Sequence, residues 1–205
     1  MEGALALVAT VISGAFLVPQ LRRLRRTQDG GGVSLTAAGV GLVSTVAWAT
    51  YGFGTESLAL VAPSLIGAAQ YAALVWLLRS TGHTSPLSVV AALAWALVIA
   101  VSGSASAIAG HGPWAGIGTA LTIAVVVQYT PAVLDARRSE TVSGISQSTW
   151  LLIGVNGSTW ASYGLLVGDD AVAAYGVVLG VAAGAVLLAA RRASVSEAVR
   201  TAVGS

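Results

Sequence analysis

The sequence contains no cysteine and no lysine, and charged residues make up only 9% of its 205 positions. Without cysteine, both a disulfide framework and a thiolate metal site are excluded. Soluble domains carry about one quarter charged residues, and 56% of this chain is hydrophobic. Water is therefore not the main solvent of this protein.

Seven long apolar segments account for most of the chain. A helix needs about 20 mostly apolar residues to cross a hydrocarbon core of about 30 Å. The segments are approximately Ala4–Leu21, Ser34–Phe53, Ser57–Leu78, Leu87–Ala109, Trp114–Leu134, Ser148–Val167 and Ala171–Ala190. They predict an all-α polytopic protein with seven transmembrane helices in a lipid bilayer.

The ten basic residues, all of them arginines, are confined to alternate connections. They follow the first, third, fifth and seventh predicted spans, at Arg22, Arg23, Arg25, Arg26, Arg79, Arg137, Arg138, Arg191, Arg192 and Arg200. Short cytoplasmic loops are the ones that collect arginine and lysine. The pattern predicts a multi-pass protein of the cell membrane with its N-terminus outside and its C-terminus in the cytoplasm.

The remaining charged and histidine residues give no sign of other chemistry. The net charge of +2 is explained by the arginines that orient the chain, and no soluble nucleic-acid-binding module is recognisable. His83 and His111 lie in loops on opposite sides of the predicted membrane, too far apart to share a metal. We therefore expect no nucleic-acid partner, no metal, no cofactor and no enzymatic activity.

The chain contains an internal duplication, which a shift of 112 residues reveals without a gap. The matched pairs include Pro19 with Pro131, Trp48 with Trp160, Tyr51-Gly52 with Tyr163-Gly164, and Arg79 with Arg191. Matches of alanine and leucine can arise from helix composition alone. Paired prolines, tryptophans, tyrosines and arginines at one offset indicate a true repeat.

Each copy contains three predicted spans, so two copies joined directly would have opposite orientations. The fourth span lies between them and restores the same orientation. The predicted divisions are residues 1–80 for the first repeat, 81–112 for a linker helix, 113–192 for the second repeat and 193–205 for a cytoplasmic tail. Parallel repeats of this kind are a known transporter architecture, with the substrate site near the midplane at the repeat interface.

Both copies carry the same set of short motifs. They are Val18-Pro19-Gln20, Gly32-Val33-Ser34 and Trp48-x-x-Tyr51-Gly52, then Pro131-Ala132, Gly144-Ile145-Ser146 and Trp160-x-x-Tyr163-Gly164. These motifs resemble the PQ-loop motif of the SWEET, SemiSWEET and PQ-loop superfamily. Alanine replaces the eponymous glutamine in the second copy. The resemblance covers nearly the whole chain and implies a SWEET-like fold, in which two three-helix bundles rock about a central pathway. Sugars are the best-known substrates of that family.

The repeated prolines are hinge candidates. Pro19 and Pro131 lie near the cytoplasmic ends of spans one and five, where a proline weakens a helix by about 3 kcal/mol or more. Proline is also tolerated in membrane helices for structural reasons, because neighbouring helices satisfy the freed carbonyl. Its presence in both copies favours hinges formed by Pro19 with Gln20 and by Pro131, consistent with a rocking motion.

Two polar and aromatic helix faces are candidate substrate sites. Positions i, i+4 and i+7 share one face of a helix, and they are occupied by Ser44, Trp48 and Tyr51 in span two and by Asn156, Trp160 and Tyr163 in span six. An indole offers a flat apolar surface and an N–H donor, and an amide both donates and accepts. These groups suit a neutral polyol. The alternative is that both tryptophans belong to an aromatic belt at the membrane surface. Trp48, however, lies about 20 Å into its helix from the cytoplasmic side, nearer the middle of the span than its edge.

The resemblance also implies roles for individual residues. Trp48 and Trp160 match the family's substrate-stacking position, and Tyr51 and Tyr163 match its extracellular gate. Asp169 matches an acidic position of the same gate, although its counterpart in the first copy is a serine.

Ser64 and Gly176 occupy the positions of the family's sugar-binding asparagines. The loss of both amides leaves open a solute other than a hexose or disaccharide, or compensation by Asn156 and Gln70. Gly176 also begins a stripe of glycines at every fourth residue, which favours close helix packing over substrate contact.

None of the eight acidic residues lies in the middle of a span. Proton-driven carriers usually place ionisable groups inside the membrane, so the sequence predicts facilitated diffusion of a small neutral solute, with a sugar as the first candidate. A carrier of an amino acid or a vitamin-like solute, and a receptor that does not transport, are the alternatives. Whether the chain works as a monomer or a homo-oligomer is left open.

Overall fold

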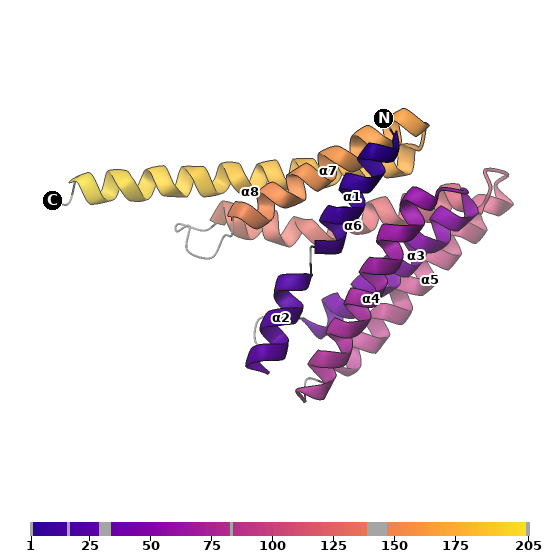
Figure 1. Ribbon diagram of the computed structural model, residues 1–205, viewed down its shortest axis with the longest axis horizontal. Helices are drawn as coiled ribbons and strands as arrows, with labels where there is room; N and C mark the ends of the chain where they lie inside the picture. Colours follow the sequence, from indigo (N-terminus) through magenta and orange to yellow (C-terminus); the bar gives the residue numbers. More distant parts are fainter. Residues whose placement is uncertain (1, 16, 29–33, 83, 139–146, 204–205) are drawn as a thin grey trace. The chain divides into compact units, whose positions relative to one another are not determined.

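The computed structural model describes residues 2–15, 17–28, 34–82, 84–138 and 147–203. Within these ranges the chain is helical and contains no β-strand (Figure 1). The helices are α1 (Glu2–Ala15), α2 (Val18–Thr27), α3 (Leu35–Gly54), α4 (Leu58–Ser80), α5 (Pro86–Ile108), α6 (Pro113–Arg138), α7 (Gln147–Val167) and α8 (Asp170–Val203). The predicted all-α fold is confirmed.

Four described stretches of helix are long and apolar enough to cross a membrane. They are Gly3–Thr27, Leu58–Ser80, Pro86–Ile108 and Asp170–Val195. The first of them runs through α1 and α2 together, so the eight helices correspond to the seven predicted spans. The last helix, α8, continues as far as Val203 through residues that the sequence assigns to a cytoplasmic tail.

The chain forms two compact units, Met1–Leu121 and Thr122–Ser205. The first unit contains α1 to α5 and the start of α6, and the second contains the rest of α6 with α7 and α8. The division therefore lies within α6. The repeat boundary that the sequence places between residues 112 and 113 stays a prediction.

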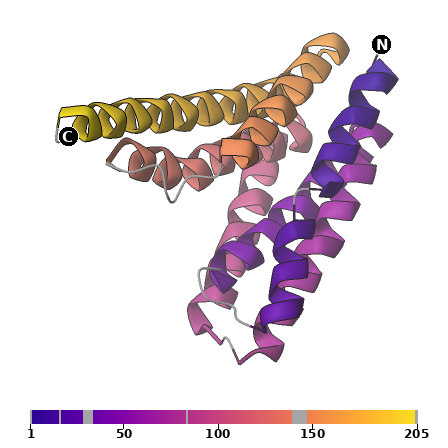
Figure 2. The ribbon, with the colours of Figure 1, turned by 60° about the vertical axis from the view of Figure 1, so that its left-hand side comes forward.

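In the first unit α4 is the central helix. It packs against α1, α2 and α3, and α3 packs on its other side against α5 (Figure 2). Glycines bring these helices close together: a Cβ atom added to Gly41 of α3 would lie 2.4 Å from the ring of Tyr71 on α4. A Cβ atom on Gly54 would lie 2.0 Å from the ring of Trp114, so the end of α3 is equally close to the start of α6.

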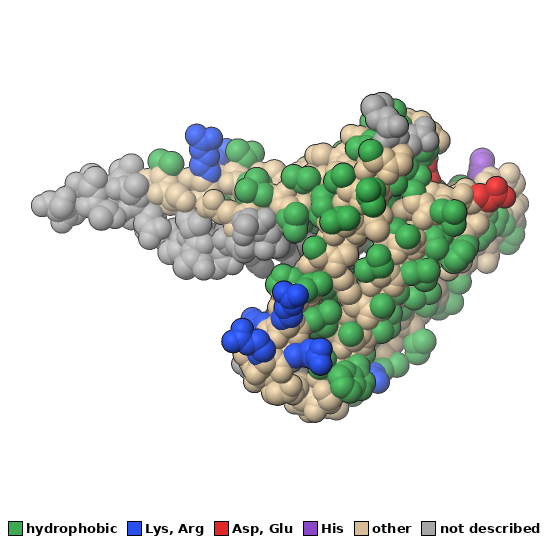
Figure 3. All heavy atoms as spheres, in the orientation of Figure 1, with side chains coloured by type: hydrophobic (Ala, Val, Ile, Leu, Met, Phe, Trp, Pro, Cys, Tyr) green, Lys and Arg blue, Asp and Glu red, His purple; other side chains and the backbone are tan. Residues whose placement is uncertain are grey.

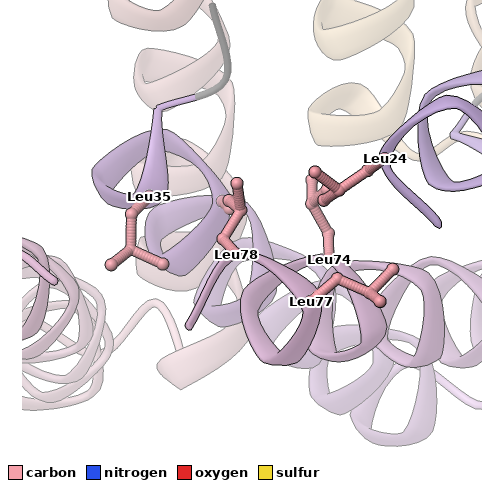
Figure 4. Packing of buried hydrophobic residues seen from close by; sticks show 6 residues of the cluster. Leu24, Leu35, Leu74, Leu77 and Leu78 are labelled. Carbon is pink, nitrogen blue, oxygen red and sulfur yellow. The ribbon is translucent and has the colours of Figure 1, made fainter. Parts of the chain in front are cut away.

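The short helix α2 has two chemically different faces. Leu24 is buried against Leu74, Leu77 and Leu78 of α4, in a cluster that includes Leu35 of α3 (Figure 4). All four arginines of α2 are exposed, and Figure 3 shows basic side chains gathered at the end of the first unit where α2 lies. The leucines thus attach α2 to the bundle and leave its arginines accessible to water or lipid headgroups.

The second unit is held by very close contact between α7 and α8. A Cβ atom added to Gly176 would lie 2.1 Å from the backbone nitrogen of Ala161. One added to Gly157 would lie 2.6 Å from the backbone nitrogen of Gly180. Small residues allow helices in membranes to approach at this range and to gain van der Waals contact. Neither position has room for a side chain.

Candidate functional site

The two units build the same turn, between α3 and α4 in the first unit and between α7 and α8 in the second. In the first unit the amide of Ser57 donates to the carbonyl of Gly52, and in the second the amide of Asp169 donates to the carbonyl of Gly164, both at 2.8 Å. A bond between these positions closes a helix by the Schellman pattern, which needs a left-handed residue just before the donor. The duplicated Tyr-Gly motif therefore ends its helix in the same way in both copies.

The left-handed position of this turn is filled differently in the two units. Glu56 has φ of 57° and Gly168, its repeat equivalent, has φ of 72°. Glycine adopts this conformation without a steric cost, whereas a residue with a Cβ atom is strained there. The first unit thus forms the common turn at a higher local energy.

Directly before each turn, a tryptophan and a tyrosine form an edge-to-face pair. The ring centroids of Trp48 and Tyr51 are 5.5 Å apart at an interplanar angle of 81°. Those of Trp160 and Tyr163 are 5.8 Å apart at 90°. Residues three apart are neighbours on a helix, and this geometry is one that aromatic pairs favour. Each unit therefore carries one half of the predicted site in the same conformation.

The tyrosine of the pair is buried in both units, but the exposure of the tryptophan differs between them. Tyr51 and Tyr163 are 6% and 7% exposed. Trp160 is 5% exposed, whereas Trp48 is half-buried. The indole of the first unit is thus the more accessible of the two to a solute.

Ser44 and Asn156 lie one turn before the tryptophans, and both are half-buried. The hydroxyl of Ser44 accepts a hydrogen bond of 2.9 Å from Nε1 of Trp95, which lies on α5. The linker helix therefore takes part in the first half of the predicted site. Trp95 is not predictable as a partner from the sequence, because periodicity within an evenly apolar span does not reveal which face meets a neighbour.

Ser64 and Gly176, the two positions where the resemblance implies asparagines, have unlike surroundings. Ser64 is half-buried on α4 and directly follows Pro63, a buried proline inside that helix. Gly176 is buried against the backbone of α7, as described above. These surroundings favour helix packing at Gly176 and leave Ser64 as the more accessible of the two positions.

Asp169 is the N-terminal cap of α8. Its Oδ1 atom accepts a hydrogen bond of 3.0 Å from the amide of Val172. Ser57, its counterpart, precedes α4 without a side-chain cap bond. A carboxylate at a helix N-terminus also interacts favourably with the helix dipole. The residue with the predicted gate role therefore has a structural role as well.

The two repeated prolines lie in different backbone surroundings. α1 ends at Ala15 and α2 begins at Val18, with Pro19 in the first turn of α2. The ring of a proline clashes with the carbonyl four residues earlier, here that of Ala15, and the missing N–H removes the helical hydrogen bond to this carbonyl. α6, in contrast, is continuous from Pro113 to Arg138 through Pro131.

Of the hinge candidates, Pro19 is exposed and Gln20 is half-buried. The side chain of Pro131 lies outside the described residues. No group of three or more histidine, aspartate or glutamate residues that could hold a metal occurs in the described part of the chain.

No family model matches the sequence, and no curated protein matches it. Among solved structures, the chain is similar to the 3.7 Å resolution structure of a eukaryotic SWEET transporter. The two share 17% of their residues, the match covers 94% of this chain and 96% of the other, and the TM-score is 0.72. The protein therefore has a SWEET-like fold, that of a polytopic all-α membrane protein.

Proposed function

We propose that the protein is a membrane transporter that carries a small neutral solute, a sugar being the first candidate, by facilitated diffusion. The observation that carries this proposal is the repeated tryptophan–tyrosine pair, built with the same geometry in two units of a SWEET-like fold. Each unit thus offers a solute the same aromatic and polar groups.

The chemistry of the described faces favours a neutral solute. Indole rings contact the apolar face of a polyol, and the neighbouring Ser44 and Asn156 offer neutral hydrogen-bonding groups. The acidic residues Glu56, Asp169 and Asp170 lie at the ends of helices. A passive mechanism needs no charge within the membrane, whereas a proton-coupled one usually does.

In this proposal the indoles of Trp48 and Trp160 contact the solute, and Tyr51 and Tyr163 close the pathway on the outer side. Pro19, Gln20 and Pro131 permit the rocking of the bundles. The separation of charge supports the orientation predicted above, with the exposed arginines of α2 in the cytoplasm.

Uptake into liposomes tests the proposal. Radiolabelled glucose and sucrose are supplied without an ion gradient to vesicles that hold the purified protein or the double variant Trp48→Ala, Trp160→Ala. Trp76→Ala is a matched control, because Trp76 is 66% exposed on α4. We expect uptake that equilibrates and falls at least about tenfold in the double variant, since stacked rings contribute about 1 kcal/mol each.

Separate Phe variants of Trp48 and Trp160 keep an aromatic ring and show whether the indole N–H is needed. Uptake that is equal in the double variant and in Trp76→Ala contradicts the proposed site. No uptake of either sugar by the wild type contradicts a carrier of these two sugars, and the screen then extends to amino acids and vitamin-like solutes. If none of these is carried, the receptor alternative is favoured.

A further inference from the structure

The segment that contains α2 carries more positive charge than its counterpart in the second copy. Residues 18–34 and 130–146 are repeat equivalents. The first segment has four arginines and one acidic residue, Asp29, whereas the second has two arginines and two acidic residues, Asp135 and Glu140. The first segment therefore has an excess of three positive charges, and the second has none.

The orientation of the chain in the membrane does not account for this excess. Orientation follows the number of arginines and lysines in short loops, and acidic residues change it little. Two arginines are present at the equivalent place in the second copy, where Leu134 and Asp135 replace Arg22 and Arg23. A surface that attracts negative charge, in contrast, depends on the net charge. The additional pair in α2 thus calls for another explanation.

The arginines of α2 surround the leucine that attaches the helix to the bundle. Leu24 is 2% exposed and packs against α4. At about 100° per residue, Arg22 and Arg26 fall on the side of α2 opposite Leu24, and Arg23 and Arg25 fall on its two flanks. All four arginines are exposed. The helix therefore carries a guanidinium group on each side that does not meet the bundle.

A fifth arginine comes from α4. Arg79 is exposed in the last turn of α4 and directly follows Leu78, which belongs to the same buried cluster as Leu24. Figure 3 shows the basic side chains gathered at this end of the first unit. Clusters of about four to eight basic residues beside a membrane span are typical of segments that bind anionic lipids.

The charges of α2 repel one another, because the helix has no acidic residue. Arg22 has Arg25 and Arg26 three and four residues further along, and like charges at these spacings destabilise a helix. The helix dipole favours the two arginines of the last turn but not Arg22. A phosphate accepts hydrogen bonds from guanidinium groups and brings the opposite charge. An anionic ligand would therefore stabilise α2.

We propose that α2 and the end of α4 form a binding surface for anionic phospholipids, whose headgroup phosphates are held by the five arginines. A lipid fits better than a soluble anion, because the arginines of α2 lie at the end of a helical stretch long enough to cross a membrane, Gly3–Thr27, where headgroups are found. The surface belongs to the first unit alone, and it does not depend on which solute is carried.

Fluorescence quenching by nitroxide-labelled lipids measures which lipid gathers at α2. The chain has no cysteine, so Thr27→Cys, at the exposed end of α2, gives a single site for a fluorophore. Phosphatidylcholine vesicles that hold the protein contain the same small fraction of labelled phosphatidylglycerol or of labelled phosphatidylcholine. Ile108→Cys is the reference site, because Ile108 is 89% exposed at the end of α5 and no arginine occurs between residues 80 and 136.

We expect the apparent association of phosphatidylglycerol with the site at residue 27 to exceed that of phosphatidylcholine at least about fivefold, the factor that one basic residue contributes near an anionic surface. The same ratio at residue 108 should be close to one. Raising the ionic strength from about 0.1 M to 1 M shortens the Debye length to about 3 Å and should lower the ratio at residue 27. A ratio there that is no higher than at residue 108, or that salt does not change, overturns the proposal.

Paired substitutions show which arginines form the surface. Arg22→Gln with Arg23→Gln removes the additional pair and keeps Leu24. Arg191→Gln with Arg192→Gln is the matched control, because it removes the same charge from exposed positions on α8. The lipid ratio at residue 27 should fall towards one in the first double variant and stay unchanged in the second. Equal falls in both would mean that the lipid responds to the charge of the whole chain, which overturns a surface on α2.

Inorganic phosphate distinguishes a lipid surface from a site for a free anion. At equal ionic strength, sodium phosphate and sodium chloride should lower the ratio equally, because free phosphate has no acyl chains to keep it beside α2. A larger fall with phosphate identifies a free-anion site and overturns the proposal. These salt measurements keep all five arginines, so they decide the question even if the Arg22→Gln, Arg23→Gln variant does not fold. None of them involves transport, so a failure of the proposed function is recognised separately.

Discussion

The two units make the same turn and the same aromatic pair, but they hold their helices together by different means. In the first unit a hydrogen bond from Trp95 joins α5 to α3, and one from Gln70 joins α4 to α1. The second unit brings α7 and α8 into near backbone contact at Gly157 and Gly176. Close contacts at glycines and polar bonds between helices occur in both units, so the units differ in which helices these contacts join.

What the units share is therefore more informative about function than what they differ in. The tryptophan–tyrosine pair and the following turn survive although the helices around them pack in unlike ways. Packing can be achieved by several side-chain combinations, whereas the proposed stacking surface for a solute needs one geometry. This contrast also indicates that equivalent substitutions in the two units will have unequal effects.

The largest difference in stability is expected when Gly176 on α8 and its repeat equivalent Ser64 on α4 are each replaced by the residue of the other unit. Gly176→Ser places a Cβ atom 2.1 Å from the nitrogen of Ala161 and must push α7 and α8 apart. We expect a loss of about 3 kcal/mol in the free energy of unfolding, the upper part of the range for overpacking. Ser64→Gly should cost only about 0.5 kcal/mol, through helix propensity.

Reversible unfolding in mixed micelles, followed by circular dichroism, measures both exchanges. Gly184→Ser is a suitable control, because a Cβ atom there meets nothing within 4 Å. Equal losses for Gly176→Ser and Gly184→Ser would show that α7 and α8 are not in close contact.

Much of the fold follows from one-dimensional features of the sequence. The spans follow from runs of apolar residues, and the repeat follows from paired prolines and aromatics, so the all-α fold is predictable without contacts. The interruption at Ala15 is foreseen only in part: Pro19 predicts a weakened helix, but the helix ends four residues earlier, where the ring clash falls.

A smaller and opposite pair of effects is expected at the outer turns. Gly168→Ala places a Cβ atom at φ of 72° and should lower the free energy of unfolding by about 1 kcal/mol. Glu56→Gly removes the same strain at φ of 57° and should raise it, by less than about 1 kcal/mol because glycine also gains freedom in the unfolded chain.

Thermal unfolding of the two variants beside the wild type gives the sign of each effect. Glu56→Ala separates the loss of the carboxylate from the relief of strain, since alanine keeps the Cβ atom. A lower stability for Glu56→Gly than for Glu56→Ala would contradict the strained turn.

The partners of the site residues are the part that sequence reasoning does not reach. Ser44 and Asn156 are repeat equivalents and both are polar, yet only a tertiary contact shows that Ser44 is bonded to the linker helix. Gln70 is visible as a polar residue in an apolar span, and its position suggests a substrate ligand as readily as a backbone partner. The bond of its amide to the carbonyl of Gly14 is visible only in the structure, because α1 and α4 are far apart in sequence.

The smallest effect is expected for the bond between Trp95 and Ser44, and it tests whether α5 belongs functionally to the first unit. Hydrogen bonds between membrane helices contribute about 0.6 kcal/mol on average, because the separated helices also find partners. The double-mutant cycle of Trp95→Phe and Ser44→Ala should give a coupling energy of about this size. Asn156→Ala combined with Trp95→Phe provides the control, since the second unit has no linker helix of its own in the sequence.

If the contact also orients the proposed solute-binding face, Trp95→Phe should weaken uptake more than its small loss of stability predicts, and Ser44→Ala should show the same change without adding to it. Additive effects of the two substitutions on uptake would mean that Ser44 acts on the solute directly and that α5 is only a connection between the repeats.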